Sequence, residues 1–201
     1  MCKRTARLHQ EVQVAPEAPD EQSQWVADLL SRDELRLACL TAVRDLHLAD
    51  CWIGAGFVRN KVWDVLHGHA VPTPLNDVDV LYFDQCSAAK AEAEFEARLT
   101  SAVPGMNWQV RNQARMHVRN SHPPYEDTAH AISSFVETAT AVAARLNKRG
   151  RVEILSPLGL DDLVHLKLRP APAYKNRVAV FEGRVKSKRW LHIWPRLKST
   201  S

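Results

Sequence analysis

The spacing of apolar residues predicts two helices in the first third of the chain. Between Leu35 and Leu46, apolar residues recur three and four positions apart, which is typical of one buried helix face, and Ser31 and Glu34 form an S-x-x-E capping box before them. The same spacing returns over residues 56–66 (GFVRNKVWDVL). Each segment is therefore expected to be an amphipathic helix.

Short runs rich in Val, Ile, Tyr and Trp predict the strands. Such runs occupy residues 50–54 (DCWIG), 77–84 (DVDVLYFD) and 107–118 (NWQVRNQARMHV). A hairpin is expected over residues 139–157, with its turn at residues 147–150 (NKRG). Four further segments have the composition of helices and are expected at residues 86–103, 127–135, 159–168 and 174–190.

The order of these elements predicts the fold class. Helices and strands alternate before the hairpin, which is typical of an α+β (mixed α/β) domain with a small mixed sheet flanked by helices, an added hairpin and a C-terminal helix. Residues 1–22 are interrupted by Pro16 and Pro19, so this segment is expected to be flexible. Residues 23–201 are expected to form a single domain.

The composition narrows the class of protein. The chain has 201 residues, of which 45% are hydrophobic and 25% charged, as in ordinary globular proteins. No apolar run reaches the roughly 18 residues needed to span a bilayer, and the first 22 residues lack the apolar stretch of a secretory signal. The four cysteines show no C-x-x-C pairing, so reduced thiols, a cytoplasmic location and no membrane contact are expected.

Positive charge is concentrated near the C-terminus. Residues 171–201 contain eight Lys or Arg and one Glu, a net charge of +7, whereas the rest of the chain carries −3. In a helix over residues 174–190, Arg177, Arg184 and Lys188 would form one stripe. This stripe is expected either to border an anion-binding cleft or to be a solvated face that keeps the protein in solution.

Two carboxylates interrupt the apolar strand expected at residues 77–84. Asp77 and Asp79 are two positions apart, so both side chains lie on one face while Val78 and Val80 pack on the other. Two like charges about 7 Å apart raise each other's pKa unless a divalent cation lies between them. Mg²⁺ prefers carboxylate oxygens, water and substrate phosphates. The pair predicts a Mg²⁺ site, while Asp-x-Asp taken alone is equally typical of a solvated strand end.

A glycine-rich corner, Gly54-Ala55-Gly56, joins an expected strand to an expected helix. Backbone N–H groups at a helix N-terminus favour phosphate, whereas Gly-x-Gly taken alone is typical of a simple turn. A phosphate site followed by a Mg²⁺ site predicts binding of a nucleoside triphosphate. By contrast, His67 and His69 have no third ligand at a standard spacing, which favours a loop over a zinc site.

These motifs together resemble the polymerase-β-like nucleotidyltransferase superfamily, in which a glycine-rich corner is followed by hydrophobic–Asp–hydrophobic–Asp–hydrophobic. More closely, the segments GAGFVRNKVWDVLHG, NDVDVLYFD, WQVRNQARMH, TATAVAARL, SPLGLDDL and KRW…WP are similar to a bacterial nucleotidyltransferase family that was formerly a domain of unknown function. The resemblance extends from Trp25 to Leu197 and implies a polymerase-β-like core.

The resemblance also implies roles for particular residues. Asp77 and Asp79 match the catalytic carboxylates that bind metal, and the corner matches the segment that holds the triphosphate. A departure is Ala55, which stands where the superfamily usually has Gly or Ser. The residues expected to bind the nucleotide are Gly54, Ala55, Gly56, Arg59, Asn60 and Arg115, with solvated surface cations as the other interpretation of the two arginines.

The absence of a third acid is the more serious departure from the superfamily's pattern. The superfamily often places one on the next core strand, where it acts as base toward the acceptor hydroxyl. Residues 107–118 contain no acid, and Asn112 and Gln113 occupy the expected region. Glu153 on the hairpin is the nearest alternative, although a solvent-facing residue explains it equally well.

The function implied is a Mg²⁺- or Mn²⁺-dependent nucleotidyltransferase. It would move a nucleoside monophosphate from ATP or another NTP to an acceptor, which is a small molecule, a protein or an RNA, with release of pyrophosphate. The alternative is a nucleotide- or RNA-binding protein of the same fold with little or no catalysis.

Overall fold

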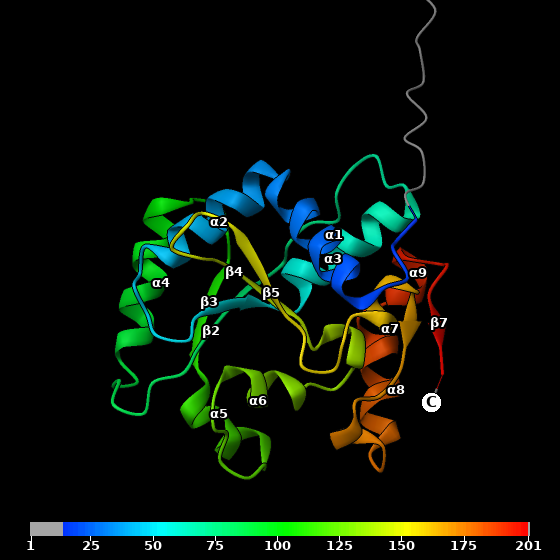
Figure 1. Cartoon of the computed structure of the whole chain (residues 1–201). Helices are drawn as coiled ribbons and strands as arrows, with labels where there is room; N and C mark the ends of the chain where they lie inside the picture. The colour runs from blue at the N-terminus through cyan, green and yellow to red at the C-terminus, as the bar shows by residue number, and fades with distance from the viewer. Residues whose placement is uncertain (1–13, 201) are drawn as a thin grey trace, which may run out of the picture.

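A five-stranded mixed sheet forms the centre of the computed structural model, which describes residues 14–200 (Figure 1). The strand order is β3-β2-β1-β4-β5; β2 and β3 are parallel and the other pairs antiparallel. The strands are β1 (Trp52–Gly54), β2 (Val78–Tyr82), β3 (Trp108–Asn112), β4 (Ala143–Leu146) and β5 (Val152–Leu155). A separate parallel pair consists of β6 (Lys167–Leu168) and β7 (Lys198–Ser199).

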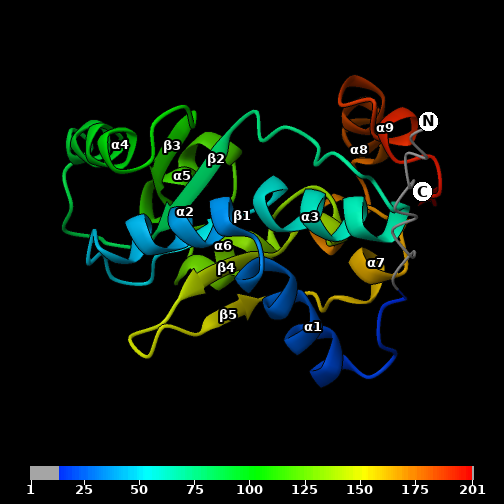
Figure 2. The same ribbon diagram turned by 90° about the horizontal axis from the view of Figure 1, so that it is seen from above.

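Helices cover both faces of this sheet. They are α1 (Pro19–Ser31), α2 (Glu34–Arg44), α3 (Gly56–His67), α4 (Ala91–Ala102), α5 (Gln113–Asn120), α6 (Thr128–Ser133), α7 (Asp161–Val164), α8 (Val178–Ser187) and α9 (Trp190–Ile193), with 3₁₀ turns at Thr138–Thr140 and Pro172–Tyr174. Figure 1 shows α1, α2 and α3 above the sheet and α5 and α6 below it. Seen from above, α4 lies at one end of the molecule and α8 and α9 at the other (Figure 2).

Each face of the sheet has its own apolar cluster, as alternation along a strand requires. Ile53, Val80 and Ala144 point into the large core with α1, α2 and α3. Trp52 and Leu81 point the other way, into a smaller cluster with α6. The α+β architecture with a mixed sheet is therefore confirmed. Among the helices described in residues 14–200, none is long and apolar enough to cross a bilayer.

Most of the predicted elements are confirmed: β1, β2, α4, α6 and the β4–β5 hairpin lie within the expected segments, and α3 extends one residue beyond its segment. The capping box is wrong. Ser31 ends α1 and donates to the Ala27 carbonyl at 2.8 Å, and Asp33 caps α2 instead, accepting from the Arg36 N–H at 3.1 Å. An Asp at the N-cap satisfies the same free donor that the serine was expected to satisfy.

Three other boundaries differ from the prediction. Residues 19–22, expected in a flexible segment, form the start of α1, where proline is well tolerated because a first-turn N–H has no helical partner; residues 1–13 lie outside the described part. The expected third strand ends at Asn112, whose side chain accepts from the Ala114 N–H at 3.0 Å and starts α5. The helix expected over 159–168 is confined to α7, because Leu166 adopts a φ of 59° and the chain continues into β6.

Asp64 on α3 connects two segments that are distant in sequence. Its buried carboxylate accepts hydrogen bonds from the Thr73 N–H at 2.7 Å and the Thr73 hydroxyl at 2.6 Å, which hold the proline-rich loop before β2. It also accepts from the Trp194 Nε1 at 2.8 Å, at the end of α9, and contacts His69 Nδ1 at 3.1 Å. One carboxylate therefore fixes both the loop and the C-terminal segment against α3.

We expect Asp64→Asn to lower the free energy of unfolding by about 3 kcal/mol, because an amide replaces one acceptor oxygen by a donor facing other donors in a buried network. Urea unfolding measures this loss. Asp45→Asn is the control: Asp45 forms an exposed pair with Arg44, so its change is expected to cost less than about 1 kcal/mol. Equal effects of the two substitutions would contradict the role of Asp64.

The turn from β1 to α3 has an unusual backbone at Ala55. Its φ is 53° and its ψ is −116°, a region that favours glycine, while its N–H donates to the Val142 carbonyl at 2.8 Å. A non-glycine residue held in such a conformation costs about 1–3 kcal/mol. The corner is therefore strained, and its position is set by the sheet.

Replacing Ala55 by Gly is expected to raise the stability of the protein by about 1 kcal/mol, since relief of strain exceeds the added entropy of the unfolded chain. Thermal unfolding should show a Tm higher by about 2–4 °C for a chain of this size. The same substitution at Ala97, within α4, should lower the Tm, because glycine weakens a regular helix. A lower Tm for Ala55→Gly would show that the corner is not strained.

Candidate nucleotide and metal site

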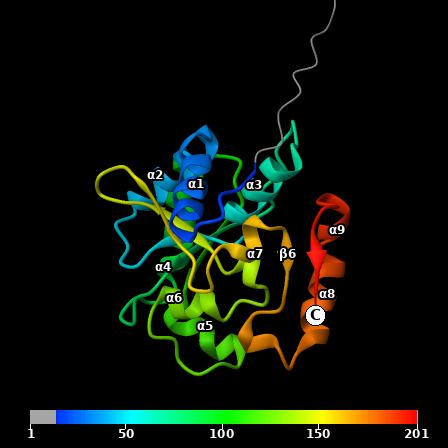
Figure 3. The ribbon, with the colours of Figure 1, turned by 45° about the vertical axis from the view of Figure 1, so that its right-hand side comes forward.

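The corner between β1 and α3 borders a pocket of about 150 Å³. Polar residues from α3, the loop before β2, β2, the 3₁₀ turn at Thr138–Thr140 and α8 line it: Arg59, Asn60, Thr73, Asn76, Asp77, Asp79, Thr140, Arg184 and Lys188. Ala55 and Gly56 form its corner, and Trp190, Ile193 and Trp194 close one side. Figure 3 shows α8 and α9 beside each other along one side of the molecule, next to α7 and β6.

Asp77 and Asp79 both line this pocket, as their spacing predicts. Asp77 lies just before β2 and is exposed, and its carboxylate accepts from the Asn107 amide at 2.7 Å. Asp79 is half-buried within β2. Burial and the neighbouring Asp77 raise the pKa of Asp79, while Arg59 and Lys188 oppose the rise.

The two carboxylates fit a hard divalent cation. Their mutual repulsion is the type that a bound cation relieves, and carboxylate oxygens are the ligands that Mg²⁺ and Mn²⁺ prefer. In the described range 14–200, no group of three or more His, Cys, Asp or Glu residues could hold a metal ion. His67 ends α3, where its Nδ1 contacts the Trp63 carbonyl at 2.8 Å, and His69 lies in the loop that follows and contacts Asp64 at 3.1 Å.

Arg59 places a buried positive charge in the same pocket. Its side chain is 7% exposed, donates to the Thr140 hydroxyl at 3.0 Å and the Asn60 carbonyl at 2.9 Å, and lies over the rings of Trp63 and Trp190. Burial lowers the pKa of Arg59 to about 10. Its Nε has no hydrogen-bond partner, and within residues 14–200 no carboxylate forms an ion pair with it. The carboxylates of Glu137 and Asp79 oppose this fall in pKa without forming an ion pair with Arg59, and a bound anion beside it would stabilise the charge further.

Two of the three tail cations reach the pocket. Arg184 on α8 and Lys188, the residue that caps its C-terminus, line it, whereas Arg177 precedes α8 and lies over the ring of Tyr174. Arg184 also donates to the fully buried Glu137 at 2.7 Å. Arg184 is therefore partly structural, whereas Lys188 is exposed and makes no ion pair among the residues that the structure describes.

The glycines of the corner have different roles. A Cβ at Gly54 would lie 2.6 Å from the Leu81 Cδ1, so this residue serves the packing of β1 against β2 and does not line the pocket. A Cβ at Gly56 would lie 3.4 Å from an Arg59 terminal nitrogen. This is an ordinary van der Waals distance, so the space at Gly56 does not require glycine; of the three corner residues expected to bind the nucleotide, Ala55 and Gly56 line the pocket and Gly54 does not.

Three of the other residues expected at the site lie elsewhere. Arg115 is on α5 and not on a strand, where it donates to the Ser87 carbonyl and pairs with Glu92 at 2.6 Å. The Asn112 side chain caps α5 and forms hydrogen bonds with the Asp84 backbone. Glu153 on β5 pairs with Arg145 at 2.7 Å and does not line this pocket.

The register of the sheet identifies the neighbour of Asp79 on the next core strand. Asp79 pairs with Gln109 on β3, and Gln109 accepts from Arg111 at 2.9 Å. Neither Asn112 nor Glu153 occupies that position, so the closest counterpart of a third acid is a neutral amide. Sequence reasoning missed Gln109 because it depends on the pairing register; it also missed Thr140 and Trp190, which bind Arg59 from distant segments.

Comparison with known proteins agrees with this geometry. A family model described as nucleotidyltransferase matches residues 41–199. An NMR structure described as revealing a CCA-adding enzyme head domain is 30% identical, with a TM-score of 0.76, over 89% of this chain and 95% of that chain. A comparison with curated proteins found no match.

Two larger enzymes share the fold. The Thermotoga maritima CCA-adding enzyme complexed with tRNA aligns over 88% of this chain with 14% identity and a TM-score of 0.55. A complex of a CCA-adding enzyme with ATP aligns over 89% with 15% identity and a TM-score of 0.53. This chain spans 42% and 43% of the lengths of those two enzymes.

The family model covers most of the chain, and the structure that is 30% identical is covered almost completely. The strand–corner–helix unit and the paired aspartates described above lie within residues 41–199, which the family model matches. This chain belongs to the nucleotidyltransferase family within the polymerase-β-like superfamily.

Proposed function

We propose that the protein is a Mg²⁺- or Mn²⁺-dependent nucleotidyltransferase that transfers a nucleoside monophosphate from ATP or another NTP to a hydroxyl or phosphate acceptor. One observation supports this most strongly. A single pocket combines two neighbouring carboxylates, Asp77 and Asp79, with the buried guanidinium of Arg59, which forms no ion pair with any residue in the described range 14–200. Metal-bound triphosphate is the ligand that satisfies both kinds of charge at once.

In this proposal each residue has a defined task. Asp77 and Asp79 would hold the divalent ion, which when bound neutralises charge on the triphosphate and polarises the α-phosphate. Arg59, Arg184 and Lys188 would bind the phosphate oxygens, and the Ala55 and Gly56 backbone would position them. The pocket is smaller than the roughly 300 Å³ of a typical small-molecule site, so the nucleoside would extend beyond it.

The reaction follows from this placement. An acceptor oxygen would form a bond to the α-phosphorus, the bond from that phosphorus to the bridging oxygen would break, and pyrophosphate would leave. The acceptor proton has no obvious protein base, because Gln109 lies beside Asp79 where an acid would be expected. We infer that an acceptor that ionises readily, or is already a phosphate, suits this site best.

The same observation at Gln109 favours one alternative, a nucleotide- or RNA-binding protein that does not turn over. One experiment distinguishes the enzyme from the binding protein. The purified protein is incubated with labelled NTPs, Mg²⁺ or Mn²⁺ and a cell extract. Transfer of label to one fraction, with release of pyrophosphate, supports the enzyme. Nucleotide affinity without any release of pyrophosphate supports the binding protein.

We expect Asp77→Asn and Asp79→Asn each to weaken Mg²⁺-dependent binding of a non-hydrolysable ATP analogue at least about tenfold, or ~1.4 kcal/mol. Each change removes one anionic ligand while the shape of the side chain is kept. Isothermal titration calorimetry in the presence and absence of Mg²⁺ measures the effect.

Glu153→Gln is the matched control for these carboxylates. Glu153 lies outside the pocket and pairs with Arg145, so neither the Mg²⁺-dependent part of analogue binding nor any transfer activity should change. The metal assignment would be abandoned if both Asn variants bound the analogue as tightly as the wild type. A loss of about a hundredfold in activity from Glu153→Gln would instead identify it as the general base.

Lys188→Gln tests the contribution of α8 to phosphate binding. Because Lys188 is exposed, its loss should weaken analogue binding about two- to fivefold, corresponding to roughly 0.4–1 kcal/mol, and flatten the dependence of binding on salt. Lys186→Gln, on the same helix but outside the pocket, should leave both unchanged. Reversal of Arg184 is less informative, since it would leave Glu137 buried without a partner. Identical behaviour of the two lysine variants would exclude a role for Lys188.

A further inference from the structure

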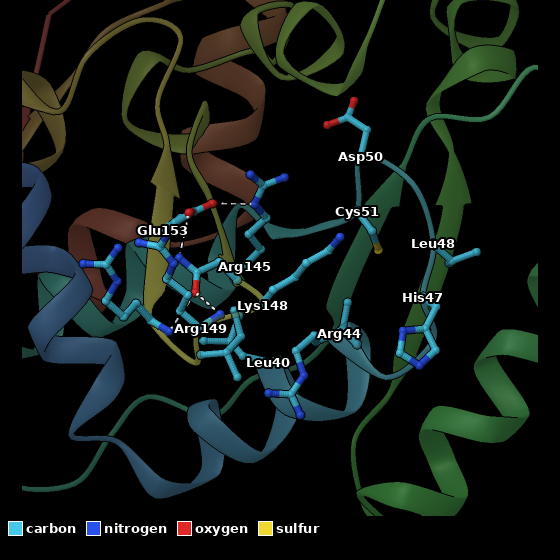
Figure 4. Close-up of a pocket in the computed structure, with 14 residues that line it drawn as sticks. Leu40, Arg44, His47, Leu48, Asp50, Cys51, Arg145, Lys148, Arg149 and Glu153 are labelled. Atoms are coloured by element: carbon cyan, nitrogen blue, oxygen red, sulfur yellow. Dashed lines mark hydrogen bonds and ion pairs between the residues drawn. The ribbon is translucent and has the colours of Figure 1, made fainter.

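A second, larger pocket lies at the opposite end of β1. Its volume is about 700 Å³, within the range of roughly 300–1,000 Å³ that is typical of small-molecule sites. The pocket described above begins after β1, at Ala55, whereas this one includes Asp50 and Cys51 immediately before β1. We call it the hairpin pocket, because residues 145–151 of the β4–β5 hairpin border it, together with residues 47–51 and α2 (Figure 4).

The floor of the hairpin pocket is apolar and uncharged. Leu40, Val43 and Leu146 are buried members of the core and contribute to it, with Leu48 beside them. Burial raises the pKa of Cys51 to about 12, so this thiol stays neutral. A neutral apolar surface of this kind suits the face of a planar base.

The rim of the pocket is strongly basic. Five lining residues are Lys or Arg and two are acids; the cations are Arg44, Arg145, Lys148, Arg149 and Arg151. Figure 4 shows cationic side chains from the hairpin and from Arg44 of α2 gathered around the pocket. The surface therefore favours an anionic ligand.

Both acids of the pocket are already engaged. Asp50 accepts from the Trp52 Nε1 at 2.9 Å and from the Thr128 N–H at 2.8 Å. Glu153 accepts from Arg145 at 2.7 Å and from the Asn147 amide at 2.8 Å. These contacts also occupy Arg145, so the cations of the turn remain for a ligand.

Hydrogen bonds within the turn order the backbone that carries its three cations. The Asn147 side-chain oxygen accepts from the Arg149 N–H at 2.9 Å and from the Arg151 N–H at 3.0 Å, and Gly150 takes a φ of 72°. Lys148, Arg149 and Arg151 are exposed, and within residues 14–200 none of them has an ion-pair partner. Arginine forks on an ordered turn match the geometry of phosphate oxygens.

We propose that the hairpin pocket binds a nucleotide through its phosphate, with the base against the apolar floor and the phosphate on Lys148, Arg149 and Arg151. A free nucleotide and a strand of single-stranded nucleic acid both present this chemistry. The site uses neither Asp77 nor Asp79, so it does not rest on the function proposed above.

The experiment uses the full chain in EDTA, which removes any metal-dependent binding at the other pocket. The probes are ADP, followed by calorimetry, and a fluorescent single-stranded RNA of about 12 nucleotides, within the span that such sites cover, followed by anisotropy. The triple variant Lys148→Gln, Arg149→Gln, Arg151→Gln should bind its ligand at least about tenfold more weakly. If the ligand is the strand, the slope of log affinity against log salt should fall by up to about 2, since each cation contributes roughly 0.7 on a single strand.

Each outcome decides the proposal. Loss of ADP binding in the triple variant supports a free nucleotide, and loss of RNA binding alone supports a strand. The proposal is overturned if neither probe binds the wild type or if the triple variant binds both probes unchanged. Arg149→Gln alone repeats the test with a single charge and should weaken binding about threefold, the scale of one exposed charge contact.

A charge-matched control separates the pocket from the overall charge of the protein. It replaces three exposed cations that line neither pocket, in the changes Arg32→Gln, Arg119→Gln and Lys198→Gln. This control should keep wild-type affinity for the probe. An equal loss in both triple variants would mean that binding depends on total charge, and would overturn the proposal.

Discussion

Four hydrogen-bond donors meet on the carboxylate of Asp64, and the position of the candidate site depends on this contact. Thr73 fixes the loop that leads to Asp77, and Trp194 fixes the segment that follows α9. The loop and the C-terminal segment are thereby both held against α3, the helix that also carries Arg59. A buried carboxylate that satisfies donors from two distant segments specifies one arrangement of them, since any other leaves polar groups unpaired in the core.

In the free protein, the negative charge of Asp79 and the positive charge of Arg59 are both only partly compensated. Burial and Asp77 raise the pKa of Asp79, and burial lowers the pKa of Arg59. Each charged form is therefore disfavoured in the free protein, and each is favoured by a ligand of opposite charge. A direct ion pair between Asp79 and Arg59 would stabilise both charged forms. Thr140 and Trp190 instead hold Arg59 in place by a hydrogen bond and a ring contact. The protein thus keeps its charges apart.

The sequence was sufficient wherever local chemistry determines the structure. Alternation put Asp77 and Asp79 toward one pocket, and helical spacing predicted α3. Errors arose where a short polar contact or a register decides, as in the cap by Asp33, the break at Asn112 and the pairing of Asp79 with Gln109. No local signal specifies which residues face each other across two strands. The residues that surround Arg59 could likewise not be predicted from the sequence, because Trp190 is more than a hundred positions away along the chain.

That separation has a consequence for the order in which the protein is made. A growing chain that has reached residue 170 already contains all five strands of the central sheet and α3, so its core can begin to form. Trp190, Trp194, Arg184 and Lys188 have not yet been synthesised. At this stage the residues that close one side of the pocket are absent, and Arg59 lacks one of its two aromatic neighbours. Synthesis of residues 171–200 therefore adds the aromatic wall and the two cations of α8 and its end to a pocket whose corner and aspartates are already in the chain.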